Sequence, residues 1–265
     1  MSRAVLAAVV AVSGATGGAE RAVRLYAAGS LRVAMTEVAK AFTASGGSSV
    51  DATFGASGLL RERIERGEPA EVFASADLGH PQTLAKAGRA EPPVVFTRNR
   101  LCALVAPGVD ATPETLLDRM LNPSVRLGTS TPKADPAGDY AWQLFEKAEK
   151  VRPGAYAKLD AKAMQLTGGP SSPPPPHDRS LYATLVAERN ADIFLTYRTN
   201  ALPAVKEVRG ARIIAIGEPL AVGADYGLTI VNGASPGARR FAAFVMSKPA
   251  QDILARHGFT PVGTP

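Results

Sequence analysis

Two stretches, AAGSLR at 27–32 and FGASGLLRERIERGEPAEVFASAD at 54–77, decide how this chain folds. Each places a serine, Ser30 or Ser57, between the end of an apolar strand and the start of a helix. Serine at that position commonly caps the helix, and the free N–H groups of the first turn point beyond it. Together with the positive end of the helix dipole, such groups bind anions. The two stretches therefore predict either two ordinary caps or a site for a small oxyanion.

Strand-like and helix-like segments alternate along the chain. The expected strands are 22–29, 50–56, 71–76, 101–107, 125–130, 191–197, 212–217 and 226–231. The expected helices are 31–44, 58–66, 78–88, 113–121, 137–149, 180–189, 236–247 and 249–257. This alternation is typical of an α/β fold with parallel sheets covered by helices, in which ligands bind beyond the carboxyl ends of strands. The segment GGPSSPPPP at 168–176, including its Pro-rich part 170–176, is expected to be an extended loop.

Residues 1–19 have the composition of a secretory signal peptide. Arg3 precedes an apolar run at 4–12, and Gly17 and Ala19 stand where signal peptidase would read them. The run is well short of the roughly 20 residues that cross a bilayer. We therefore expect a periplasmic protein whose mature chain has no membrane span.

The same region allows a competing interpretation, a glycine-rich dinucleotide-binding turn on Gly14, Gly17 and Gly18. That fingerprint requires a helix directly after the glycines. The next apolar stretch, 22–30, reads as a strand that ends in a turn, which disfavours this interpretation.

Composition fits an exported globular protein. Hydrophobic residues make up 46% of the 265 and charged residues 20%, which is enough for a large core. Lone Cys102 cannot form an internal disulfide and is expected to pack as a small hydrophobe. The net charge is +6, and basic residues are interspersed with acidic ones, as at 61–71. This distribution predicts weak attraction of anions and no continuous basic surface for nucleic acid. His80, His177 and His257 lack the spacing of a metal site.

Five motifs occur in one order along the chain. They are AAGSLR, FGASGLLRERIERGEPAEVFASAD, DPAGDYA (135–141), LVAERNADIFLTY (185–197) and SKPAQDILARHGF (247–259). Together they resemble the periplasmic molybdate-binding proteins of ABC transporters. The resemblance implies a two-lobe type II periplasmic-binding-protein fold, each lobe a mostly parallel sheet flanked by helices. Lobe 1 is then 22–102 plus 228–265 and lobe 2 is 103–227, with a two-crossing hinge near 101–107 and 226–231.

The resemblance also implies an oxyanion held by neutral donors. In this family the serines of the first two strand-helix turns bind the oxyanion, and they match Ser30 and Ser57. The second lobe supplies the alanine of the PAGxYA helix start, a backbone N–H in a loop and the tyrosine that ends a strand. These match Ala137, Arg179 and Tyr197. Molybdenum or tungsten would be present only as the bound oxyanion, with no protein–metal ligand and no cofactor.

The function implied is capture of molybdate or tungstate and delivery to a membrane permease by a monomer, without nucleic acid or covalent chemistry. A related receptor for another oxyanion or a small organic anion shares every motif. An enzyme is the third reading, but GASG lacks the spacing of a nucleophile elbow. Asp77 is expected to cap the helix 78–88, and the direction of Arg198 stays open. Because no assigned donor titrates between pH 6 and pH 8, affinity is expected to be flat there.

Overall fold

A computed structural model describes residues 21–174, 176 and 179–263. The expected signal peptide, the competing glycine-rich turn and His177 lie outside the described residues. In chain order the described elements are β1 (Val23–Ala28), the 3-10 turn η1 (Gly29–Leu31), α1 (Arg32–Ala44), β2 (Val50–Gly55), α2 (Ser57–Glu65), β3 (Val72–Ser75), α3 (Gly79–Lys86), β4 (Val94–Val105), α4 (Leu116–Leu121), β5 (Leu127–Ser130), α5 (Pro136–Val151), α6 (Ala155–Lys162), β6 (Met164–Thr167), α7 (Leu181–Ala187), β7 (Ile193–Tyr197), α8 (Arg198–Glu207), β8 (Arg212–Ala215), β9 (Gly223–Ile230), α9 (Pro236–Val245), α10 (Lys248–Arg256) and β10 (Thr260–Pro261). Among these described elements, no helix is long and apolar enough to span a membrane.

The strands form one curled sheet in the order β2-β1-β3-β9-β4-β7-β5-β6, and β8 and β10 pair with β4 off this path. At one end β1 runs parallel to β2 and β3, and at the other β5 runs parallel to β6 and β7. The long strands β4 and β9 are antiparallel to their neighbours. The expected α/β class is confirmed, with antiparallel strands in the middle.

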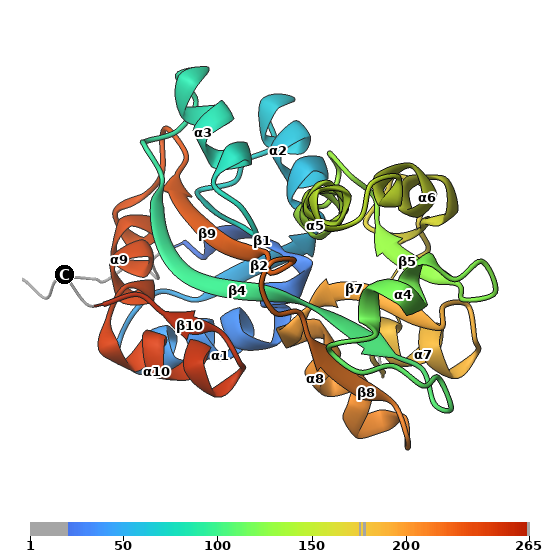
Figure 1. Ribbon diagram of the computed structural model, residues 1–265. Coiled ribbons are helices and arrows are strands. Elements are labelled where there is room, and N and C mark those ends of the chain that lie inside the picture. Colours follow the sequence, from blue (N-terminus) through green and yellow to red (C-terminus); the bar gives the residue numbers. More distant parts are fainter. Residues whose placement is uncertain (1–20, 175, 177–178, 264–265) are drawn as a thin grey trace, which may run out of the picture.

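Strand β4 belongs to both halves of the molecule. Its first part, through Arg100, pairs with β9, and its second part, from Leu101, pairs with β7 and β8. The chain crosses back beside this point, where the Leu101 N–H donates to the Val222 carbonyl at 3.1 Å. Figure 1 shows β4 running from one half to the other. We call the part built on β1–β3 and β9 lobe 1, and the part built on β5–β7 lobe 2; the residue boundaries expected from the sequence stay a prediction.

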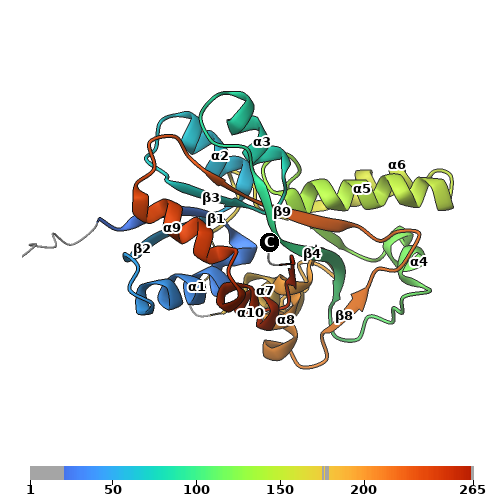
Figure 2. The same cartoon turned by 90° about the vertical axis from the view of Figure 1, so that its left-hand side faces the viewer.

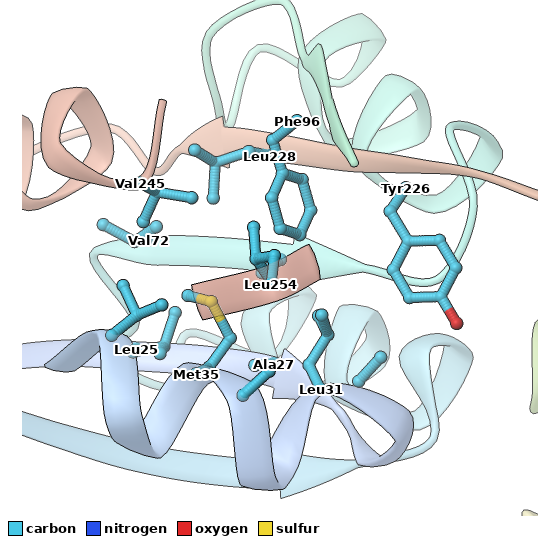
Figure 3. Close-up of a cluster of buried hydrophobic side chains, with 14 of the residues drawn as sticks. Leu25, Ala27, Leu31, Met35, Val72, Phe96, Tyr226, Leu228, Val245 and Leu254 are labelled. Carbon is cyan, nitrogen blue, oxygen red and sulfur yellow. The ribbon is translucent and has the colours of Figure 1, made fainter. Parts of the chain in front are cut away.

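Each lobe has its own buried core. In lobe 1, apolar side chains from strands and helices interdigitate, and Tyr226 lies at the edge with its hydroxyl pointing away from the other labelled side chains (Figure 3). The labelled residues of that core include Leu25, Met35, Val72, Phe96, Leu228, Val245 and Leu254. In lobe 2, Phe145 is fully buried beneath Trp142, with ring centroids 5.0 Å apart. Helices α5 and α6 lie side by side on this lobe (Figure 2). Cys102 is buried and unpaired, as expected.

Candidate functional site

A cavity of about 610 Å³ lies at the carboxyl ends of β1, β2 and β7, between the two lobes. Four of the five residues assigned from the sequence line it, namely Ser30, Ser57, Arg179 and Tyr197. The fifth, Ala137, does not line it, whereas Asp135, two residues earlier, does. A second cavity, of about 640 Å³, is lined by other residues, among them Arg98 and Asp225, and contains none of the five. The first cavity is therefore the candidate site.

Ser30 lies in the 3-10 turn between β1 and α1 and does not cap a helix. Leu31 occupies the N-cap of α1, which has no side-chain cap bond, so the expected cap is wrong. The Ser30 Oγ instead lies 2.9 Å from the Tyr226 hydroxyl. Asn99 donates to that same hydroxyl at 3.2 Å. Ser30 and Tyr226 can each donate to the other, and the Ser30 hydroxyl lies in the wall of the cavity, where it can bond to a ligand.

Ser57 is fully buried at the first position of α2, and it too is not a cap. The N-cap is Ala56, without a side-chain bond. The Ser57 Oγ accepts the backbone N–H of Ala76 at 3.1 Å. The hydroxyl proton then remains free to donate, because the oxygen already accepts this N–H. Both serines therefore line the cavity without being the helix caps that the sequence suggested.

Tyr197 ends β7 in lobe 2 and reaches lobe 1. Its hydroxyl donates to the Ala76 carbonyl at 3.3 Å. Burial raises the pKa of Tyr197 well above its usual value, so the group stays a neutral donor. A second contact crosses between the lobes nearby, where the Gly58 N–H of α2 donates to the Ala134 carbonyl at 2.9 Å. The lobes thus touch at the edge of the cavity.

Ala137 is buried in the first turn of α5, and its N–H is already used. Asp135 is the N-cap of this helix, and its Oδ1 accepts the Ala137 N–H at 3.0 Å. The predicted donor at Ala137 therefore faces a carboxyl group of the same chain. Asp135 was not predicted to line the cavity, although aspartate directly before a proline at a helix start is a recognisable capping signal in DPAGDYA.

The Asp135 carboxyl has a perturbed acidity. Burial raises its pKa to about 6, against hydrogen bonds from the Ala137 N–H and Ser130 that lower it, and nearby Asp139 and Asp77 raise it further. Gly168, at φ +75°, packs so closely that a Cβ there would lie 2.5 Å from Asp135 Oδ2. The cavity wall therefore includes a carboxyl group that was not among the residues expected from the sequence.

The loop before α7 contributes to the cavity wall. Pro173, Pro174 and Pro176 line it, together with Arg179. The Arg179 guanidinium is more than half exposed and lies 4.0 Å from Glu188. Arg198 is exposed and does not line the cavity.

More cations than anions line this cavity. Its basic side chains are Arg32, Arg179, Lys206 and Arg256, and its carboxylates are Asp135 and Glu207. Asp77 lies outside this cavity and accepts the His80 N–H at 3.3 Å. The N-cap of α3 is Leu78, so Asp77 bonds the first turn of the helix from the position before the cap. Within the ranges that the structure describes, no cluster of three histidine, cysteine or acidic side chains is arranged for a metal ion.

Two lobes joined by two adjacent chain crossings, with a polar cavity between them at the carboxyl ends of strands, define a type II periplasmic-binding-protein fold. The chain belongs to the family of bacterial extracellular solute-binding proteins, whose model matches residues 23–260. This family consists of receptors rather than enzymes.

Individual relatives are similar over much of the chain. An uncharacterized Pasteurella multocida protein is 40% identical over 67% of this chain and 74% of its own length. The molybdate-binding protein ModA of Escherichia coli is 26% identical over 94% of this chain and 93% of its own. The resemblance to the molybdate-binding receptors is thereby confirmed.

Solved structures share the fold at low identity. The periplasmic molybdate-binding protein of Azotobacter vinelandii superposes with a TM-score of 0.73 at 18% identity, over 91% of this chain and all of that one. The sulfate-binding protein SubI of Mycobacterium tuberculosis superposes with a TM-score of 0.75 at 18% identity, over 92% and 88% of the two chains. These two similarities establish the fold and leave the ligand open.

Proposed function

We propose that this protein is the periplasmic receptor of an ABC importer and that its ligand is molybdate or tungstate. The observation that carries the proposal is the convergence of Ser30 and Ser57 from lobe 1 and Tyr197 from lobe 2 on one cavity. The excess of basic side chains around that cavity supports an anionic ligand. The relationship to molybdate-binding proteins favours the larger metal oxyanions.

Hydrogen bonds of this kind are sufficient for tight binding. A bond from a neutral donor to a charged ligand contributes roughly 1.5–3 kcal/mol net. A micromolar complex requires a binding free energy of about 8 kcal/mol. Several such hydrogen bonds together supply this free energy and also offset the cost of closing the lobes. The receptor would deliver its ligand to a membrane permease as a monomer, without covalent chemistry or a resident cofactor.

Calorimetric titration tests the ligand. The mature chain is titrated at pH 5.5 with molybdate, tungstate, sulfate, phosphate and thiosulfate. We expect micromolar or tighter binding of molybdate and tungstate, and sulfate weaker by at least about 100-fold, or roughly 2.7 kcal/mol. Equal binding of sulfate would favour a receptor for another oxyanion.

A pair of variants tests whether the ligand binds in the cavity. Ser57→Ala should weaken molybdate binding, while Ser45→Ala should not, because Ser45 lies at the far end of α1 and its hydroxyl donates to the Phe42 carbonyl, away from the cavity. An unchanged dissociation constant for Ser57→Ala would remove that serine from the site.

A further inference from the structure

The Asp135 carboxyl occupies the place that an anion would take at the start of α5. Helix N-termini attract anions through free N–H groups, and here the N–H of Ala137 is bound by Asp135 Oδ1 at 3.0 Å. The side chain lies in the cavity wall that also includes Ser30, Ser57 and Tyr197. An oxyanion in this cavity therefore meets a carboxyl group, and competes with it for the same helix start.

The surroundings of Asp135 supply hydrogen bonds and further negative charge. Ser130, at the end of β5, hydrogen-bonds to the Asp135 carboxyl. Tyr182 of α7 is close enough to this carboxyl to interact with it electrostatically. Asp139, one turn along α5, and Asp77, after β3, are the charged groups that act on it most. Each of the two has a partner of its own: Asp139 accepts the Lys133 N–H at 2.9 Å, and His80 lies 4.0 Å from Asp77.

Two charged side chains of the cavity wall have partners outside it. Arg179 lies 4.0 Å from Glu188, and Glu207 accepts the Ser180 N–H at 3.0 Å. Two negative charges in contact inside a cavity cannot both stay ionised, because like charges raise the cost of the second ionisation. A carboxylate beside a dianion is therefore expected to take up a proton.

On the basis of the function proposed above, we propose that Asp135 is a ligand-binding residue that couples oxyanion capture to the uptake of one proton. In the occupied site that proton lies between the Asp135 carboxyl and an oxygen of the ligand. No covalent bond forms or breaks: carboxylate, dianion and one proton give a carboxylic acid that donates to the dianion. Burial already raises the pKa of Asp135 to about 6, so the free site is ready to take up the proton near neutral pH.

The source of the proton depends on the ligand. A fully ionised dianion such as molybdate or sulfate must draw it from solution. A monohydrogen oxyanion such as phosphate can bring its own, since phosphate keeps one proton near neutral pH. Asp135 thus favours the binding of fully ionised dianions at low pH. As the pH rises, the ratio of their affinity to that of phosphate falls.

The test is calorimetry of molybdate binding from pH 5 to pH 8, in two buffers of different ionisation enthalpy. For the wild type we expect affinity to fall by up to tenfold per pH unit above about pH 6, with about one proton taken up at pH 7.5. Asp135→Asn keeps an oxygen for the Ala137 N–H but carries no charge, so its affinity should be flat with pH and tighter than wild type at pH 7.5. Asp51→Asn, at an exposed position of β2 that does not line the cavity, is the matched control and should keep the wild-type profile.

A flat wild-type profile without proton uptake, or an Asp135→Asn profile that matches the wild type, would overturn the proposal. A melting curve shows whether Asp135→Asn is folded, and the wild-type proton count tests the proposal without the variant. If sulfate binds with this Asp135-dependent profile and molybdate does not, the proposed ligand fails and the proton coupling stands. If no anion of the panel binds the folded protein, both fail.

Discussion

Ser57 has a structural partner as well as a predicted ligand. Its Oγ accepts the Ala76 N–H inside the protein, so Ser57→Ala leaves a buried N–H without an acceptor. We expect a loss of about 1–3 kcal/mol in the free energy of unfolding, together with about 1.5–3 kcal/mol of binding. Ser30→Ala should cost less stability, because the Tyr226 hydroxyl keeps its bond from Asn99. Urea unfolding and calorimetry on both variants separate the two effects, and a Ser30→Ala variant that binds as tightly as wild type would contradict the donor role.

Asp135 also makes the stability of the empty receptor depend on pH. Its folded-state pKa of about 6 lies above its ordinary 3.8, so the folded state holds the proton more tightly than the unfolded state. Its contribution to stability is present below about pH 4 and is lost as the pH rises to about 6. Relative to wild type, Asp135→Asn should therefore gain about 2–3 kcal/mol between pH 4 and pH 7. Denaturant titrations of both proteins at the two pH values measure this difference, and a constant difference would contradict it.

Three short motifs, AAGSLR, FGASG and ADIFLTY, were enough to predict residues that line one cavity, and binding of a ligand by these residues stays a prediction. The bonds that orient them were not predictable, because Ser30 depends on Tyr226 and Ser57 on Ala76, far along the chain. Asp135 was not predicted to line the cavity because the DPAGDYA motif was interpreted through the backbone N–H of Ala137, and the acid two residues before it was not considered.

At the scale of elements, the middle of the sheet was the least predictable part. The first half of β4 has the polar sequence TRNR, which reads as a loop, yet Thr97 and Asn99 are buried there. Thr97 bonds the Thr260 carbonyl of β10, and Asn99 bonds Thr199 of α8. These partners are distant in sequence, so local pattern could not reveal them.

Helices α6 and α8 were missed for local reasons. Helix α8 carries Pro203 inside it, and α6 follows Gly154 in the left-handed conformation at φ +83°. Both features ordinarily signal the end of a helix. The strands and helices with clear apolar periodicity were predicted to within a few residues of their bounds.

Asn99 of β4 hydrogen-bonds to residues of α8 and β9, and its substitution is expected to change ligand binding from a distance. It donates to Thr199 at 2.8 Å and to Tyr226, which in turn faces Ser30. Asn99→Ala should weaken molybdate binding several-fold although Asn99 lies behind Ser30. If the effect runs through Ser30, it should vanish when Asn99→Ala is made in the Ser30→Ala background, as a double-mutant cycle measures. An unchanged effect in that background would show that Asn99 acts by another route.

At the scale of the whole molecule, Gly58 controls how closely the lobes approach. A Cβ at this position would meet the Lys133 carbonyl and would lie 2.8 Å from the Ala134 carbonyl of lobe 2. Gly58→Ala should therefore hold the lobes apart without destabilising either, since alanine favours the helix. We expect weaker molybdate binding and a larger radius of gyration in the presence of ligand, measured by small-angle scattering. Gly217→Ala, where a Cβ would meet nothing within 4 Å, is the control; equal scattering by the two variants would contradict the close contact.

The central claim is that the cavity between the lobes binds the oxyanion. Its most direct test is an anomalous difference map from crystals of the protein with molybdate, recorded at the molybdenum absorption edge. We expect one strong peak in the cavity, placed so that the oxygens of the bound molybdate lie within hydrogen-bonding distance of the Ser30 and Ser57 hydroxyls and beside the Asp135 carboxyl. A peak elsewhere, or an empty cavity in crystals that contain bound molybdate, would contradict it.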